Sequence, residues 1–167
     1  MVVGRRYRYI YPVEKIMSSE IEILKRCGEL TGTYDVSEFT DKKGQLLKEK
    51  IRKVEVSYNN GELVFLGNSF MPKQVRIMSG YILTGEKKIL PGKYLTLEKI
   101  ILSNELKEII IEEVDNILEV NVLNVEKIKD IYIFYVLKNK KGEVIGKNAS
   151  NIKALRKKYG KIVVKTV

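Results

Sequence analysis

Histidine is absent from the 167-residue chain, and cysteine occurs only once, as Cys27. A single cysteine cannot close a disulfide within the chain. Zinc sites of the finger or ribbon type are excluded because they need four Cys or His ligands, and Ser-His and Cys-His nucleophilic pairs are excluded because they need an imidazole. We therefore expect no metal, no cofactor and no conventional enzyme, although chemistry by Tyr, Lys or carboxylate side chains stays open. Cys27 is interpreted as a buried helix residue.

Long hydrophobic runs are missing as well. No apolar stretch approaches the roughly 18 residues that span a bilayer. The basic start, Met1–Arg6, is not followed by the apolar segment of a secretory signal. Hydrophobic residues make up 44% of the chain and charged residues 31%, which is typical of a folded, water-soluble protein. We expect a cytoplasmic protein with no membrane partner.

Acidic residues are scarce in one part of the chain, residues 131–167. Glu143 is the only acid there against ten basic residues, so the segment carries a net charge of +9. The other 130 residues hold 21 basic and 20 acidic residues and are almost neutral. A neutral body with a strongly basic end is typical of a protein that binds a polyanion. The alternative is a solvated surface of a lysine-rich protein.

The first 102 residues are expected to form a β-rich module with one helix. Residues 2–11 alternate as a strand with Tyr7 and Tyr9 on one face. A helix is predicted from Ser18 or Ser19 onward, with Ile21, Leu24 and Leu30 as its apolar stripe. Five further strands are predicted, over residues 53–58, 63–66, 75–83, 87–90 and 93–102.

Turn signals separate these strands. Asn59-Asn60-Gly61 favours a hairpin because both central turn residues need a positive φ. Asp41-Lys42-Lys43-Gly44 and Gly85-Glu86-Lys87-Lys88 are interpreted as surface loops, and neither they nor Lys42-Lys43-Gly44-Gln45 match a phosphate-binding P-loop. Several short antiparallel strands predict a small barrel or a curled sheet.

Residues 103–167 show a sharper pattern. A helical stripe runs from Leu106 to Leu118 through Ile109, Ile110, Val114 and Ile117. Strands are predicted over 119–128 and 131–137, a short helix over 139–145, a basic helix over 150–159 and a last strand over 161–166. The expected order is α-β-β-α-α-β, and the expected fold class of the whole chain is α+β.

The turn between the two short helices carries the clearest chemical signal. It reads Ile145-Gly146-Lys147-Asn148-Ala149-Ser150. Gly146 lets the backbone approach a ligand closely, and Lys147 and Asn148 offer charge and hydrogen bonds. Ser150 is predicted to cap the basic helix, whose first N–H groups and dipole attract a phosphate. Ile152, Leu155 and Tyr159 are expected to face the core.

This turn resembles the Ile-Gly-x-x-Gly signature of KH domains, and is most similar to the type II KH domains of NusA-type transcription factors. The resemblance covers about residues 103–167, and the family has the element order given above. It implies that the turn clamps the backbone of about four nucleotides of single-stranded RNA, with single-stranded DNA as a further partner, while bases lie in an apolar groove. The candidates for this groove are Val144, Ile145 and Ile152, with a core position as the alternative for Ile152. The site residues that follow are Ile145, Gly146, Lys147, Asn148, Ala149, Ser150, Lys153, Arg156 and Lys157.

Ala149 departs from the family because it stands where the second glycine is expected. We expect alanine to adopt helical geometry there, so that the fold is kept while the methyl group hinders the ligand. The alternative function is therefore a protein-protein adaptor or an assembly factor of a larger protein or ribonucleoprotein complex. Its degenerate KH domain would contact protein.

A candidate secondary contact lies near the N-terminus, where Arg5, Arg6, Tyr7 and Arg8 interleave cations with an aromatic ring. Such a strand can stack on bases and pair with phosphates. The alternative interpretation is a half-buried strand with tyrosine inward and arginine outward.

Overall fold

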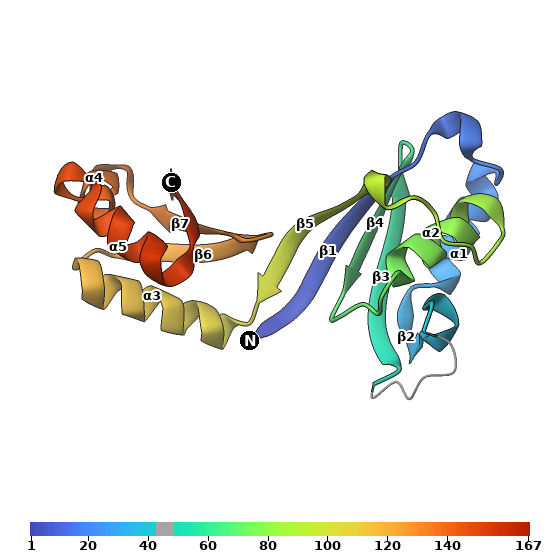
Figure 1. Ribbon diagram of the computed structural model, residues 1–167, viewed down its shortest axis with the longest axis horizontal. Helices are drawn as coiled ribbons and strands as arrows, with labels where there is room; N and C mark the ends of the chain where they lie inside the picture. The colour runs from blue at the N-terminus through green and yellow to red at the C-terminus, as the bar shows by residue number, and fades with distance from the viewer. Residues whose placement is uncertain (43–48) are drawn as a thin grey trace. The chain divides into compact units, whose positions relative to one another are not determined.

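The computed structural model describes residues 1–42 and 49–167, in which α-helices and β-strands are mixed (Figure 1). The predicted loops at 41–44 and 42–45 lie partly outside this range. The chain forms two compact units. The N-terminal unit is Gly4–Glu98, and the C-terminal unit is Lys99–Val167 together with Met1–Val3. None of the described helices is long and apolar enough to cross a membrane.

The sheet of the N-terminal unit has the strand order β2-β3-β4-β1-β5. The strands are β1 (Val2–Ile10), β2 (Gly32–Asp35), β3 (Ile51–Asn59), β4 (Glu62–Gly67) and β5 (Leu95–Leu102). Strands β3 and β4 form the predicted hairpin, and Asn60 and Gly61 at its turn have φ of 49° and 82°. Both values lie in the left-handed region that a tight hairpin turn requires, so this prediction is confirmed.

Helices α1 (Glu20–Glu29) and α2 (Gln74–Thr84) share one core with this sheet. Tyr9, Leu63 and Phe65 reach that core from the strands and Met78 and Ile82 from α2, and all five are fully buried. The opposite face of the strands presents charged side chains, including Arg6 and Arg8 of β1. Alternation along β1 therefore separates a tyrosine face from an arginine face, as the sequence predicts.

Helix α2 overturns the strand predicted at Val75–Leu83, so the described part of the N-terminal unit has two α-helices rather than one. Eight of its eleven residues are buried, which leaves no polar face to reveal a helical period. A continuous apolar run can be read as a buried strand or a buried helix, and here the second reading holds. The strand predicted at 87–90 is also wrong, because these residues form an irregular connection.

Helix α1 begins where predicted, but of the predicted apolar stripe only Leu30 is buried. Ser19 is its N-cap, and its hydroxyl and the Glu22 carboxylate form a capping box. The buried residues are Ile23, Cys27 and Leu30, whereas Ile21 is 81% exposed and Leu24 is 51% exposed. Two apolar stripes are possible on this helix, and packing against β3 and α2 selects the one that contains Cys27.

In the C-terminal unit the elements follow the predicted order. They are α3 (Asn104–Leu118), β6 (Val122–Ile128), β7 (Ile131–Val136), α4 (Lys141–Ile145), α5 (Ser150–Tyr159) and β8 (Lys161–Thr166). Strands β6 and β7 are antiparallel, and β7 and β8 are parallel. Ile100 of β5 pairs with Lys127 of β6. A parallel pair needs a crossover connection, which α4 and α5 provide.

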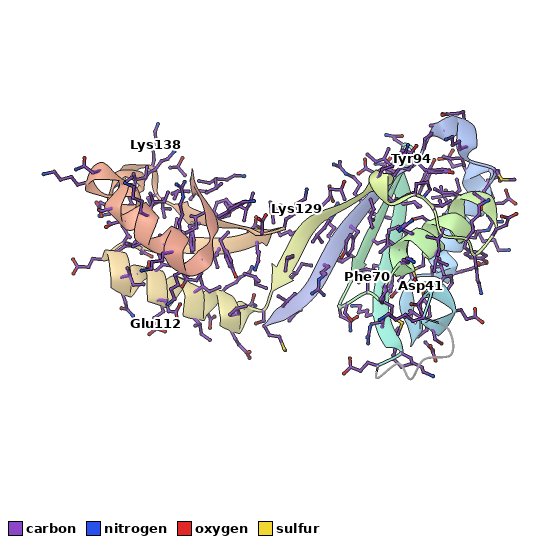
Figure 2. All side chains as sticks on the ribbon, in the orientation of Figure 1. Asp41, Phe70, Tyr94, Glu112, Lys129 and Lys138 are labelled. Carbon is purple, nitrogen blue, oxygen red and sulfur yellow. The ribbon has the colours of Figure 1, made fainter. Side chains whose placement is uncertain are left out.

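The core of the C-terminal unit lies between these helices and the sheet, around Phe134, Val144 and Leu155. On α3, Ile110 and Val114 are buried, but Ile109 and Ile117, which were placed on the same stripe, are 54% and 50% exposed. Glu112 lies on the outer side of α3 (Figure 2) and is exposed. The short 3-10 helices in the described ranges are Val13–Lys15, Ser37–Phe39, Gly92–Tyr94, Lys138–Lys140 and Lys147–Ala149.

Two helical glycines offer a matched test of the N-terminal core. A Cβ on Gly80 of α2 would lie 2.2 Å from the carbonyl oxygen of Lys88, whereas a Cβ on Gly28 of α1 meets nothing within 4 Å. We expect Gly80→Ala to destabilise the protein by about 2 kcal/mol or more through overpacking. Gly28→Ala should be neutral or stabilising by up to about 1 kcal/mol. Urea unfolding followed by circular dichroism checks both, and equal effects would contradict the packing of α2 against residues 86–88.

Candidate nucleic-acid interface

Gly146 ends α4 in a backbone conformation that suits only glycine, with φ 74° and ψ 164°. A Cβ at this position would lie 2.7 Å from Cγ of Asn151 and 2.9 Å from its backbone nitrogen. The glycine is therefore required by contacts inside the protein. Its predicted role, the close approach of a ligand, is an additional role and stays a prediction.

Asn151 ties the two helices of the crossover together. Its Nδ2 donates a hydrogen bond to the carbonyl oxygen of Glu143 at 2.8 Å, across the turn. Carbonyls in the last turn of a helix have no partner within that helix, so this bond satisfies one of them. Asn151 is not among the site residues predicted from the sequence. The available signal was an asparagine in the first turn of a helix, directly after a glycine-containing connection.

The turn itself is built from two residues in the left-handed region. Asn148 has φ 54° and Ala149 has φ 58°. Asparagine tolerates this region. Alanine is strained there, because the alanine Cβ approaches the following carbonyl oxygen at a cost of about 1–2 kcal/mol. The expectation that Ala149 keeps ordinary helical geometry is therefore wrong. Its backbone adopts the left-handed form that glycine takes without a steric penalty.

Helix α5 begins without a side-chain cap. Its N-cap residue is Ala149, and no side chain accepts a hydrogen bond there. Ser150, which was predicted to be the cap, is the first helical residue, and its hydroxyl lies 3.4 Å from Oδ1 of Asn151. The first turn of α5 also holds no acidic residue. The Ser150 N–H donates to the carbonyl oxygen of Lys147, and no side chain caps the N–H groups that follow it.

The cations predicted to bind nucleic acid are exposed. Lys147 lies in the turn, and Lys153, Arg156 and Lys157 lie on α5 with the i, i+3 and i+4 spacing of one helix face. Within residues 1–42 and 49–167, none of these four forms an ion pair with an acid. Their charges therefore add to one positive surface that begins at the start of α5.

Other cations of the same segment are paired with acids. Lys158 lies 2.8 Å from Glu113, and Lys161 lies 2.7 Å from Asp130. Lys140 pairs with Glu143 at 2.8 Å. The excess charge of residues 131–167 is thus reduced around α4, on the side of α5 that faces α3 and at the start of β8. It is not reduced at the turn.

The opposite face of α5 holds the helix in place. Leu155 is 1% exposed, and the ring of Tyr159 packs against Tyr132 and Phe134 with centroid distances of 5.5 and 5.9 Å. The Tyr159 hydroxyl donates to Glu113 of α3. Burial and this carboxylate raise the pKa of Tyr159 above its ordinary value. The turn is therefore presented by a helix that is fixed to the core.

The apolar groove is smaller than predicted. Ile145 and Ile152 are half-buried, so both retain surface that a base can contact. Val144 is fully buried in the core and cannot line a groove. Its assignment as a groove residue is wrong, because α4 turns this side chain toward Leu155 and the sheet rather than toward solvent.

The candidate secondary contact belongs to the N-terminal unit. Arg6 and Arg8 lie 3.1 and 3.2 Å from the carboxylate of Glu98, and Arg8 also lies 3.6 Å from Glu62. Tyr7 points to the opposite face and packs edge-on against Phe70. Arg5 is half-buried. These pairs favour the alternative of a half-buried strand, and a contact with nucleic acid by Arg5–Arg8 stays a prediction.

No protein-family model matches the sequence, and a search of curated proteins finds no relative. No group of three or more Cys, Asp or Glu residues in the described part of the chain is placed to hold a metal ion. The resemblance to KH domains therefore rests on the residues of the turn and on the order of the elements around it.

Ala149 provides a test of the turn geometry. Ala149→Gly removes the left-handed strain, and we expect it to stabilise the C-terminal unit by about 0.5–1 kcal/mol. Ala154→Gly, on the exposed face of α5, should destabilise it by about 1 kcal/mol, because glycine there only loses more entropy on folding. Hydrogen exchange of the slowest amides in β7 and β8 measures both changes. The same sign for the two variants would contradict a left-handed Ala149.

Glu113 predicts a dependence of stability on pH. Hydrogen bonds from Lys158 and then Tyr159 hold the pKa of this carboxyl below its ordinary value of 4.5. Its contribution to stability is therefore present above the ordinary value and is lost as pH falls through the lowered pKa. We expect Glu113→Gln to be less stable than the wild type at neutral pH and equally stable in strong acid. Urea midpoints across this range test it, with Glu112→Gln as the control that shows no such convergence.

Proposed function

We propose that this protein binds single-stranded RNA through the turn Gly146–Ala149 and the exposed face of α5. One observation carries the proposal. An uncapped helix start lies beside Lys147, and three further cations without acid partners in the described residues follow on the same helix. Free amides, a helix dipole and mobile lysine side chains are the groups that bind phosphates in proteins.

The arrangement favours a single strand over a duplex. The half-buried side chains of Ile145 and Ile152 offer apolar surface beside the phosphate-binding groups. Unpaired bases can lie on such a surface, whereas the bases of a duplex are stacked inside it. The phosphates would lie along the turn and along Lys153, Arg156 and Lys157, which continue the positive surface for more than one nucleotide.

The resemblance to type II KH domains supports the same proposal. The order α3-β6-β7-α4-α5-β8 is that of the family, and the turn joins the two helices that follow the second strand. In the family this turn clamps about four nucleotides. Ala149 lies in the left-handed region, where a glycine fits without strain, and the difference from the family signature is one methyl group.

The alternative function is a protein adaptor. It is favoured by the same methyl group and by Ile109 and Ile117, which are both exposed on α3. The two functions differ in their response to salt. Binding of RNA through several lysines weakens steeply as salt rises, and an apolar protein interface does not.

Fluorescence polarisation with short labelled RNA and DNA oligomers, at low and moderate salt, tests the proposal. The variant is Lys147→Asp/Asn148→Asp, which replaces the cation and the amide of the turn by carboxylates. We expect the wild type to bind single strands and the variant to lose at least about tenfold in affinity, with a shallower salt dependence.

The matched control is Lys15→Asp/Asn116→Asp, which makes the same change of charge at two exposed positions that belong neither to the turn nor to α5. It should bind within about twofold of the wild type. Circular dichroism establishes that each variant is folded. Absence of binding at tens of micromolar protein, or equal losses in the two variants, would overturn the RNA clamp and favour the adaptor.

A further inference from the structure

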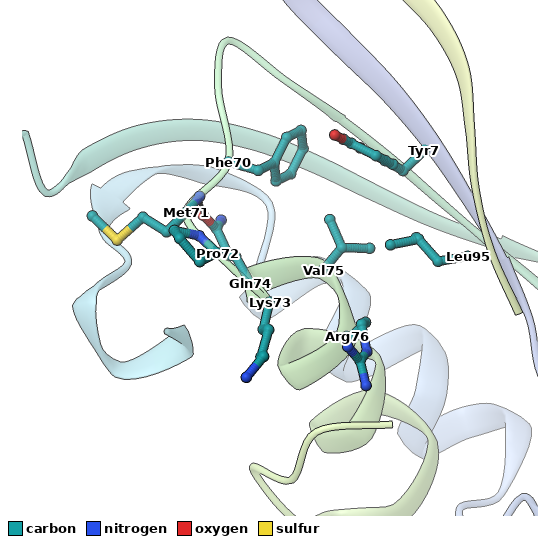
Figure 3. A pocket seen from close by; sticks show the side chains of 9 residues that line it. All are labelled: Tyr7, Phe70, Met71, Pro72, Lys73, Gln74, Val75, Arg76 and Leu95. Carbon is teal, nitrogen blue, oxygen red and sulfur yellow. Dashed lines mark hydrogen bonds between the residues drawn. The ribbon is translucent and has the colours of Figure 1, made fainter. Parts of the chain in front are cut away.

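A pocket of about 380 Å³ lies within the N-terminal unit, at the start of α2 (Figure 3). This volume is within the range of small-molecule sites. Its walls come from β1, from the connection between β4 and α2, from the first turn of α2 and from β5. The lining residues are Tyr7, Phe70, Met71, Pro72, Lys73, Gln74, Val75, Arg76 and Leu95.

One side of the pocket is aromatic and apolar. The rings of Tyr7 and Phe70 meet edge to face with centroids 5.3 Å apart, and both are half-buried. Val75 and Leu95 lie beside them (Figure 3). Within the described residues the Tyr7 hydroxyl has no hydrogen-bond partner. A flat ring with polar edges would find faces to stack against and one hydroxyl group to bind.

The other side is cationic. Lys73 and Arg76 leave the first turn of α2 on the side away from the two rings (Figure 3). Arg76 donates from Nε to the carbonyl oxygen of Leu90, and this bond leaves the two terminal nitrogens of the guanidinium for other acceptors. It pairs with no acid among residues 1–42 and 49–167. Lys73 pairs with Asp41 at 2.6 Å, and both side chains are partly exposed, so an anion can compete for the lysine.

A buried amide lies between the two sides. Gln74 is fully buried, and its Oε1 accepts a hydrogen bond from the backbone N–H of Met71 at 2.8 Å. Its Nε2 reaches only the thioether sulfur of Met78, at 3.7 Å. The amide nitrogen carries two donor hydrogens, and a thioether is a weak acceptor for one of them. Because the side chain has no exposed surface, the amide fixes the connection before α2 in the wall of the pocket.

We propose that this pocket binds a nucleotide, with the base against Tyr7 and Phe70 and the phosphate at Arg76 and Lys73. The ligand must have an aromatic end and an anionic end, because the pocket has one wall of each kind. An apolar ligand would use only the first wall, and a free phosphate only the second. The nucleotide can be a free mononucleotide or one residue of a single strand, which share this chemistry.

This site belongs to the N-terminal unit and does not depend on the turn at Gly146–Ala149. The pocket gives Tyr7 of β1 a different role from the one predicted from the sequence. In that prediction, Tyr7 and its neighbouring arginines act together. In the structure, Arg6 and Arg8 are paired on the other face, and the cation on the side of Tyr7 comes from α2.

The test is a titration of the full-length protein followed by ¹H–¹⁵N NMR. The probes are adenosine 5′-monophosphate, uridine 5′-monophosphate, adenosine alone and inorganic phosphate. We expect saturable shifts of the amides of residues 70–76 and of Tyr7, with either nucleotide binding about tenfold or more tightly than adenosine or phosphate alone. A single nucleotide is too short to occupy a clamp for four, so the turn residues should not shift.

Three variants complete the test. Arg76→Gln removes the cation and should weaken nucleotide binding about fivefold or more, Arg76→Lys should keep most of it, and Lys15→Gln is the control for charge. A trinucleotide in the Lys147→Asp/Asn148→Asp background distinguishes the two sources. If the trinucleotide binds at residues 70–76 more tightly than a mononucleotide does, the natural ligand is a single strand. Equal affinities of the two indicate a free nucleotide.

Two results would overturn the proposal. One is the absence of saturable shifts at residues 70–76 with any probe up to millimolar concentration. The other is nucleotide binding that Arg76→Gln leaves unchanged while its spectrum shows an intact fold. Either result leaves RNA binding by the turn untouched, and failure of the turn to bind RNA leaves this pocket untouched, because the two tests use different ligands and different residues.

Discussion

The parallel pairing of β7 with β8 is the constraint on which the candidate RNA site depends. Parallel neighbours cannot be joined by a hairpin, so the chain must leave the sheet and return to the end at which β7 began. Helices α4 and α5 make this crossover, and the turn Gly146–Ala149 lies where one helix gives way to the other. Val144 and Leu155 anchor them to the sheet, and the bond from Asn151 to Glu143 joins them directly. The exposed turn is therefore held at both ends by buried residues.

Charge pairing then decides which part of a very basic segment can attract a polyanion. The acids near this segment, Glu113 and Asp130, lie on α3 and before β7, and they bind the lysines at positions 158 and 161. The turn and the outer face of α5 lie beyond their reach. Opposite charges stabilise the fold where α5 meets its neighbours, and uncompensated charge remains in the turn and along the exposed face of α5. In the N-terminal unit, Glu98 and Glu62 form ion pairs with arginines of β1. These arginines are therefore less able to attract a polyanion than the cations of α5 that have no acid partner among the described residues.

The spacing of hydrophobic residues predicted where most helices and strands lie better than it predicted which face of a helix is buried. The hairpin at Asn60-Gly61 and the basic helix ending at Gly160 have local causes, namely turn residues that need a positive φ and a helix stop. The buried face of α1 is different, since Ile21 and Leu24 are as apolar as Ile23, and only contact with the neighbouring elements distinguishes them. Helix α2 was missed because burial on nearly every side removes the polar positions that mark a helical period.

The sequence by itself determined the order of the elements after residue 103, the segregation of positive charge and the position of the turn, because each depends on residues that are close together in the chain. Tertiary structure decided which cations remain unpaired, that Val144 is core, and that Ala149 is held in the left-handed region. It also created the pocket of the N-terminal unit, whose aromatic wall comes from β1 and the connection after β4 and whose cations come from α2. Such a site has no local signature, because the strands and the helix that form it are brought together only by packing around a shared core.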